Sequence, residues 1–288
     1  MNPLTLALWQ TPYAENTAQA LTQLDSAASQ AKAKGAELLL GAEMGLAGYA
    51  IGAQQAKALA EAANGPMART VAAIARRHQI AIVYGYPEQH PNGQQPFNAV
   101  QAITPDGQAI GHYRKTHLYG EMDRQQFTEG DAVSHIFSYQ DWRLGLLICY
   151  DVEFPETVRL LALQGADAVL VPTANMVGFD EVPQLLVPAR ACENRVFIAY
   201  ANACGSEAAL SYGGLSTVAQ PDGRTLAQAN DQAQMLFATL DGNALALSRQ
   251  SSPLAHRRPA LYDGLSTSDN TERWDRIRSR PHPALGRE

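Results

Sequence analysis

Short hydrophobic runs alternate along the chain with Ala-rich stretches of helical periodicity. The runs have the length and composition of buried strands, whereas the Ala-rich stretches repeat hydrophobic residues every three or four positions. The predicted strands cover residues 4–9, 37–43, 80–86, 97–103, 109–115, 143–149, 166–173, 196–202, 215–220 and 234–240. Interleaved strands and helices predict an α/β fold in which helices pack on sheets with buried inner faces.

Local signals place the ends of several elements. Asn16 is a good N-cap for a helix over 16–34, and Gly35 suits its C-terminal stop. The sequence TPDG predicts a tight turn joining 97–103 and 109–115 into a hairpin. Other helices are predicted to begin at Pro66, to run from Pro155 to Leu163, and to cover about 182–194.

The composition favours one compact domain. Hydrophobic residues make up 46% of the 288 residues, and no Pro-, Gly- or Ser-rich linker interrupts them. We therefore expect a single domain over 1–264, whose two halves of similar element order suggest two stacked sheets between helical layers. Residues 265–288 are polar and contain Pro and Arg, so they are predicted to form a tail that either wraps the body or is disordered.

Charge and cysteine content limit the possible binding partners and the cellular compartment. The net charge of −6, without clusters of Lys and Arg, argues against a nucleic-acid partner. No apolar run approaches the roughly 20 residues of a membrane span, and the first residues lack a signal-peptide pattern, so a cytoplasmic protein is expected. Cys149, Cys192 and Cys204 form no CxxC pair, which predicts reduced thiols and neither a disulfide framework nor a metal site.

Three residues able to carry chemistry lie at the ends of predicted strands: Glu43, Lys115 and Cys149. Ligand sites in layered α/β folds collect at the carboxyl ends of strands. Cys149 also precedes Pro155, which can open a helix, and such a strand–turn–helix arrangement presents a nucleophile. Taken singly, each residue also has a structural interpretation: a buried core thiol for Cys149, a cap or surface carboxylate for Glu43, and part of a basic edge for Lys115.

Together, three blocks around these residues resemble the catalytic blocks of the nitrilase or carbon–nitrogen hydrolase superfamily: GAEMGLAGY, HYRKTHLYGEMDRQQFTEGD and LGLLICYDVEFPE. The resemblance extends from LTLALWQ to about RRPALYDGL. Within the superfamily the sequence is most similar to bacterial aliphatic amidases of the 5-aminopentanamidase and R-stereoselective amidase type. The resemblance implies a four-layer α-β-β-α sandwich, a homodimer or larger homo-oligomer, and no cofactor.

The resemblance also implies a mechanism. Cys149 attacks the carbonyl of a small amide to form a thioester, while Glu43 serves as general base and acid. Lys115 and the backbone N–H of Tyr150 stabilise the oxyanion. Many relatives carry a second glutamate eight residues after the lysine; here that position is Asp123, so either Asp123 or Glu121 fills this role.

The residues that line the substrate pocket are less clearly indicated by the sequence. Asn175 and Met176, after the strand at 166–173, are expected to line the pocket with backbone groups or to form a simple turn. Glu121, Asp180 and Glu181 could receive the amine of an ω-amino amide such as 5-aminopentanamide, or could be solvated surface acids.

Other activities stay open at this stage. A nitrilase or an N-carbamoyl amine amidohydrolase would use the same triad, and a non-catalytic interaction protein is an alternative if the cleft is blocked. A serine hydrolase is disfavoured because GGLST at 213–217 is not G-x-S-x-G. A metal hydrolase using His112 and His117 is disfavoured because H-E-x-x-H is absent.

Overall fold

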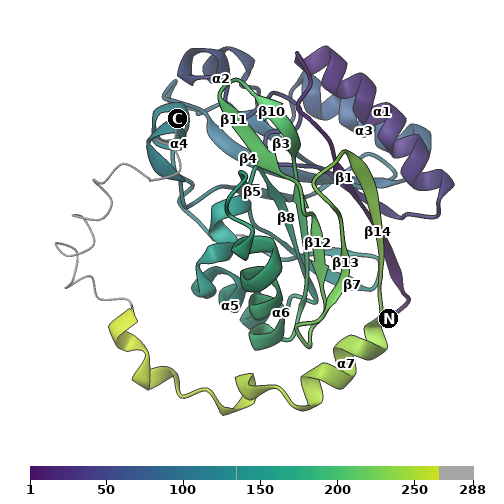
Figure 1. Cartoon of the computed structure of the whole chain (residues 1–288), viewed down its shortest axis with the longest axis vertical. Coiled ribbons are helices and arrows are strands. Elements are labelled where there is room, and N and C mark those ends of the chain that lie inside the picture. The colour runs from purple at the N-terminus through teal and green to yellow at the C-terminus, as the bar shows by residue number, and fades with distance from the viewer. Residues whose placement is uncertain (134, 266–288) are drawn as a thin grey trace.

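The computed structural model describes residues 1–133 and 135–265, which form two six-stranded sheets with helices on their outer faces (Figure 1). The first sheet has the order β14 (Gln234–Leu240), β1 (Leu4–Gln10), β2 (Leu38–Leu40), β3 (Ala81–Glu88), β4 (Phe97–Ile103), β5 (Ala109–Arg114). The second has the order β13 (Thr225–Gln228), β12 (Thr217–Ala219), β9 (Phe197–Asn202), β8 (Ala168–Thr173), β7 (Trp142–Leu146), β6 (Phe137–Tyr139).

The two sheets share one pairing scheme. Strands β1, β2 and β3 are parallel to one another, as are β7, β8 and β9. The strands outside these triplets all pair antiparallel. Parallel strands require crossover connections, and helices on the outer faces provide them.

Helices cover both outer faces. Helices α1 (Thr17–Ala33) and α3 (Pro66–His78) lie on the first sheet, and α5 (Pro155–Gln164) and α6 (Val187–Asn194) lie on the second (Figure 1). The alternation along β2 shows this layering: Leu38 and Leu40 join the core between the sheets, whereas Leu39 packs into the cluster under α1 and α3. The predicted four-layer α-β-β-α sandwich is confirmed.

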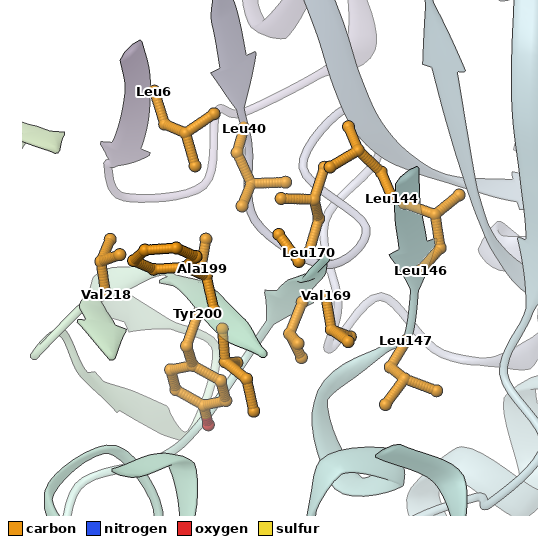
Figure 2. Packing of buried hydrophobic residues seen from close by; sticks show 14 of the residues in the cluster. Leu6, Leu40, Leu144, Leu146, Leu147, Val169, Leu170, Ala199, Tyr200 and Val218 are labelled. Atoms are coloured by element: carbon orange, nitrogen blue, oxygen red, sulfur yellow. The ribbon is translucent and has the colours of Figure 1, made fainter. Parts of the chain in front are cut away.

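The core between the sheets is built from aliphatic side chains of both. In Figure 2, Leu6 and Leu40 of the first sheet face Leu170 and Ala199 of the second. These side chains are 1% exposed or less, and fully burying one leucine contributes about 2 kcal/mol. This packing fixes the two sheets against each other and hence the strand ends that carry the site.

Several local predictions are confirmed. Asn16 caps α1, because its Oδ1 accepts a hydrogen bond from Gln19 N at 3.0 Å. Gly35 follows the helix end with a φ of +85°, a conformation that favours glycine. Strands β4 and β5 form the expected antiparallel hairpin.

Other elements differ from the prediction. The strands expected over 37–43 and 143–149 end at Leu40 and Leu146, since the chain leaves each sheet before it reaches Glu43 or Cys149. The helix expected over 182–194 begins with a π-helical turn, Val182–Leu186. Helices that the pattern did not predict include α2 (Ala53–Leu59), α4 (Gly120–Gln126) and α7 (Gly242–Gln250). Strands that it did not predict are the edge strands β6 and β13 and the hairpin of β10 (Cys204–Glu207) and β11 (Leu210–Gly213).

The C-terminal part that the structure describes consists of short 3₁₀ turns, Pro253–His256, Pro259–Leu261 and Asp263–Leu265. Apart from Leu265, the predicted tail over 265–288 lies outside the described residues. Among the helices described, none combines the length and apolar character that crossing a membrane requires.

Candidate active site

Cys149 lies at a strained turn after β7. Leu147 and Ile148 continue the buried run, and Cys149 then opens the 3₁₀ turn η1 (Cys149–Glu153), with α5 beginning at Pro155. The φ of Cys149 is +47°, which is costly for a residue with a Cβ and is typical of functional turns. The thiol borders a recess that is lined mostly by aromatic side chains. The sequence therefore folds here as the expected strand–turn–helix.

Glu43 lies in the turn that follows β2. Its Oε1 accepts hydrogen bonds from Asn98 Nδ2 and Lys115 Nζ, both at 2.7 Å. Tyr13 Oη donates to its backbone carbonyl at 2.7 Å and so fixes the turn. Its Oε2 is buried and has no hydrogen-bond partner among the described residues, which leaves that atom free to accept a proton.

Lys115 follows β5 and is fully buried. Its Nζ donates to Glu43 Oε1 and to Asp123 Oδ2, each at 2.7 Å. Asp123 belongs to the short helix α4, and Tyr119 N also donates to its Oδ2, at 2.9 Å. The structure thus places one ammonium between two carboxylates.

Of the two acids considered beside the lysine, the structure brings Asp123 to it and not Glu121. The side chain of Glu121 is 72% exposed and pairs with Arg124 at 3.7 Å on the surface of α4. The rotation of the helix explains the difference, because side chains two residues apart point to different sides of it. The expectation that Glu121 supports the lysine or lines the pocket is wrong.

Burial and mutual charge set the protonation states of the three central groups. Burial raises the pKa of Glu43, an effect that Lys115 opposes and Asp123 strengthens. Burial and the Glu43 charge raise the pKa of Cys149 well above its ordinary value, despite the nearby ammonium. Burial alone would lower the pKa of Lys115, but Asp123 and Glu43 outweigh it and hold that pKa well above normal. The favoured state is a neutral thiol beside a basic carboxylate and a charged lysine.

A third buried carboxylate, Asp151, joins the Lys115 loop to the Cys149 turn. It accepts hydrogen bonds from donors on both segments: Tyr113 Oη at 2.9 Å, Thr116 Oγ1 at 3.1 Å, His117 N at 3.0 Å and Ile148 N at 3.1 Å. The sequence pattern did not predict this role of Asp151. The available signal was an acidic residue only two positions after a buried hydrophobic run. A carboxylate at such a place is buried, and a buried carboxylate requires several hydrogen-bond donors.

The two histidines considered for a metal serve separate networks. His117 lies against Asp151 at 2.8 Å and stacks on Phe154, with ring centroids 3.9 Å apart. His112 instead pairs with Glu88 at the far end of β3. Within residues 1–133 and 135–265, no three His, Cys, Asp or Glu side chains are arranged to hold a metal ion.

The recess beside Cys149 is mostly aromatic. Its lining consists of Tyr49, Tyr119, Cys149, Tyr150, Glu153, Ala174, Asn175, Met176 and Phe179. Four rings and one carboxylate therefore surround the thiol. Glu153 was not among the residues that the sequence analysis selected.

Asn175 and Met176 line this recess as expected, but the backbone of Asn175 is already engaged. Its N–H donates to Asn202 Oδ1 at 2.8 Å, and its carbonyl accepts from Gly213 N and Asn202 Nδ2. The expectation that Asn175 offers backbone groups to a substrate is wrong. Instead, the buried side chain of Asn202 holds the backbone of Asn175 through these hydrogen bonds, so that Asn175 forms part of the wall of the recess.

The acids expected beyond Asn175 lie elsewhere. Asp180 and Glu181 are both exposed, and neither lines the recess. The expectation that Asp180 forms part of the substrate pocket is wrong for this structure. These residues precede the π-helical turn at Val182, whose buried side chains anchor it while the acids face solvent.

The sequence matches the family model for carbon–nitrogen hydrolases over residues 5–250. The chain belongs to the carbon–nitrogen hydrolase family. This carbon–nitrogen hydrolase is 47% identical over 239 residues to a hydrolase from the pqqF 5′ region of Pseudomonas protegens, a match that covers 82% of each chain. It is 34% identical over 232 residues to an (R)-stereoselective amidase from Pseudomonas sp., covering 80% of this chain and 82% of the relative.

A solved amidase from Nesterenkonia sp. AN1 has the same fold as this carbon–nitrogen hydrolase. The two align with a TM-score of 0.79 and 32% identity, over 91% of this chain and 99% of that one. A mutant of that amidase shows covalent addition of the acetamide moiety of fluoroacetamide at the active-site cysteine. The predicted enzyme class, a hydrolase of the amidase type acting on carbon–nitrogen bonds, is confirmed.

Proposed function

We propose that this enzyme hydrolyses a small aliphatic amide to a carboxylic acid and ammonia through a thioester on Cys149, with Glu43 and Lys115 completing the triad. One observation carries the proposal: Lys115 Nζ lies 2.7 Å from both Glu43 and Asp123, and the thiol of Cys149 is close enough for Glu43 and Lys115 to shift its pKa. The recess beside the thiol is lined mostly by aromatic rings, which suit the methylene groups of a short aliphatic chain.

The first half-reaction forms the thioester. Glu43 Oε2 takes the thiol proton as the sulfur of Cys149 attacks the amide carbonyl, and Lys115 with the Tyr150 N–H stabilises the oxyanion. Glu43 then returns that proton to the nitrogen as the carbon–nitrogen bond breaks, so that ammonia departs. A carboxylate with a raised pKa suits both proton transfers.

The second half-reaction releases the acid. Glu43 deprotonates a water molecule that attacks the thioester, and the proton it gains returns to the departing sulfur. Lys115 stays charged throughout, because Asp123 and Glu43 hold its proton. Its role is therefore electrostatic and not that of an acid.

The finer identity of the substrate is also a proposal. We favour an ω-amino amide such as 5-aminopentanamide, because the carboxylate of Glu153 lines the same recess as the thiol of Cys149. An N-carbamoyl amine or a nitrile would use the same nucleophile, and relatives of this chain include an N-carbamoylputrescine amidase of Arabidopsis thaliana at 29% identity. Ammonia release from matched short amides, carbamoyl amines and nitriles distinguishes these three activities.

The setting of the enzyme is proposed on similar grounds. We propose that residues 1–264 act as one hydrolase domain, supported by the family match over 5–250. We further propose a cytoplasmic homodimer or larger homo-oligomer. Three free cysteines support a reducing compartment, and light scattering of the full chain tests the assembly.

Substitution of the nucleophile tests the mechanism. Cys149→Ala is expected to lower ammonia release at least about a thousandfold, while the matched variants Cys192→Ala and Cys204→Ala keep turnover within about threefold. Iodoacetamide should inactivate the wild type, with the adduct on Cys149 by mass spectrometry. Full turnover by Cys149→Ala would refute the proposal.

A further inference from the structure

Glu153 is placed to meet the part of a substrate remote from the amide. It ends the 3₁₀ turn that Cys149 begins, and its side chain lines the same recess as the thiol. Four residues of 3₁₀ helix advance about 8 Å, so a short chain with its carbonyl at the sulfur extends toward this carboxylate. The recess therefore has a reactive end and a charged end.

The carboxylate of Glu153 lacks a partner in the described structure. It forms no hydrogen bond or ion pair with another described side chain, although most of it is buried. The ammonium of Lys115, one of two cations that influence it, is already held by Glu43 and Asp123. A largely buried carboxylate without a counter-ion is unfavourable, and a cationic ligand would relieve this.

The second cation, Arg190 of α6, is also engaged. Its guanidinium donates to the backbone carbonyls of Val152 at 3.1 Å and Glu153 at 2.7 Å, and contacts the Glu193 carboxylate at 3.4 Å. Arg190 thus fixes the backbone of the turn and leaves the Glu153 side chain to face the recess. The backbone that carries this carboxylate is therefore held in place, while Arg190 does not neutralise the carboxylate itself.

The walls next to Glu153 suit a cation as well. The ring of Tyr119 lies 5.2 Å from that of Tyr150 and 6.1 Å from that of Phe179, each in an edge-to-face arrangement. Aromatic faces attract an alkylammonium group and also pack against its methylene groups. A pocket of rings closed by one carboxylate is a recurring way to bind such a group.

The groups around Glu153 set its pKa close to neutral pH, so a bound ligand can change its protonation. Burial and the nearby Glu181 raise its pKa to about 7, while Lys115 and Arg190 act in the opposite direction. The hydroxyl groups of Tyr119 and Tyr200 also lie within its field. Near neutral pH the carboxyl is therefore divided between its two forms, and an incoming ammonium would favour the ionised one.

We propose that Glu153 is the specificity residue of this enzyme and binds a terminal ammonium group, so that the substrates are short ω-amino amides. The inference rests on the proposed amidase function and identifies its substrate class. Glu153 replaces Glu121, Asp180 and Glu181, the surface acids to which the sequence analysis assigned amine recognition. Hydrolysis of the amide takes place at Cys149, and Glu153 acts only on binding.

Paired substrates test this assignment. The wild type should show a kcat/KM for 5-aminopentanamide at least about tenfold above that for pentanamide, as expected for a largely buried charge pair. Glu153→Gln should bring this ratio close to one, with the loss mainly in KM. The matched control Glu181→Gln removes a neighbouring but exposed carboxylate and should keep the ratio within about threefold of the wild type.

The pH dependence of the same ratio gives a second readout. The substrate amine stays protonated below about pH 10, so only the enzyme titrates. The ratio should rise with pH through the pKa of Glu153, about 7, and then level off. Protonation of Glu43 or Cys149 affects both substrates and cancels in the ratio. In Glu153→Gln the ratio should not change with pH.

The outcomes are distinguishable. A wild type that hydrolyses both amides equally well keeps the amidase proposal and overturns the role of Glu153. A preference that survives in Glu153→Gln, with a folded protein by thermal melting, also overturns it. If neither amide releases ammonia, the proposed function fails, and the inference fails with it.

Discussion

Lys115 Nζ lies 2.7 Å from Glu43 Oε1, with both side chains fully buried, although the two residues are 72 positions apart in the sequence. Asp123 makes an equally short contact with the same ammonium. Two carboxylates thus share one cation, so the group retains a net negative charge beside the thiol. Burial of the thiol, together with the charge of Glu43, raises the pKa of Cys149, so Cys149 is held as a thiol and needs a base at the moment of attack.

Removal of the shared cation should affect both activity and stability. Lys115→Met is expected to lower kcat by about a hundred- to a thousandfold, the usual loss for one oxyanion donor. It should also lower the free energy of unfolding by about 3–5 kcal/mol, because two buried carboxylates lose their partner. Steady-state kinetics and urea unfolding measure the two effects. The exposed Lys32→Met serves as control, and a Lys115→Met enzyme with wild-type kcat would contradict the electrostatic role.

Glu43→Gln should separate the base from the scaffold. The amide can still accept from Lys115 and Asn98, so the thermal midpoint should fall by only a few degrees. Without a base, kcat should fall at least about a thousandfold, and Cys149 should react more slowly with iodoacetamide at neutral pH. Stopped-flow alkylation measures this reactivity. Unchanged alkylation would show that Glu43 does not activate the thiol.

The pH dependence of activity should follow Glu43. Because its folded pKa is raised, the carboxyl gains a proton at a higher pH than a free glutamate and then cannot take the thiol proton. We expect kcat/KM for a neutral amide to decline as pH falls through a value above 4.5. A pH–rate profile with pentanamide measures this limb. An acidic limb at or below the ordinary glutamate pKa would contradict the assignment.

Glu153 should also influence stability in a defined pH window. Its pKa rises from 4.5 in the unfolded chain to about 7 in the fold, so the folded state binds more protons between these values. Stability contributed by this group is present below the lower value and lost as pH rises toward 7. Glu153→Gln should therefore stabilise the free enzyme by about 1–3 kcal/mol at pH 8 and by much less at pH 5. Denaturant unfolding at both pH values checks the difference, with the exposed Glu121→Gln as control.

Asp151 should behave as a positioning residue. Asp151→Asn places an amide among four donors, so we expect a loss of about 3 kcal/mol in the free energy of unfolding. Tyr113→Phe removes one of those donors and should lose only about 1 kcal/mol. Both variants should lower kcat more than they raise KM, because Asp151 joins the Lys115 loop to the Cys149 turn. An unchanged kcat in folded Asp151→Asn would argue against this coupling.

Periodicity in the sequence was sufficient for the main elements and their order. The α1 cap at Asn16 and the β4–β5 hairpin follow local rules, because hydrogen bonds between near neighbours decide them. The strands near Glu43 and Cys149 were each predicted to end three residues too late. Buried hydrophobic residues continue past the end of each strand. Ala42, Leu147 and Ile148 pack in the core although they lie beyond the strands, so the hydrophobic run does not mark the strand end.

The selection of Glu121, Asp180 and Glu181 failed for a different reason. Neighbouring acids look alike in sequence, but the rotation of α4 sends Asp123 inward and Glu121 into solvent. Glu153 was overlooked because it lies inside the nucleophile block, where the hydrophobic run drew attention to Cys149. Its exposure to the recess depends on α6, whose Arg190 fixes the turn.

The sequence by itself determined the layered fold and the family, and it selected the three blocks of the proposed chemistry, because these depend on composition and order along the chain. Only the tertiary structure decided which carboxylate pairs with Lys115 and which acid closes the recess. The physical reason is that burial and pairing are relations between segments packed together in space. A carboxylate acquires its charge state from those neighbours, and sequence spacing does not specify them.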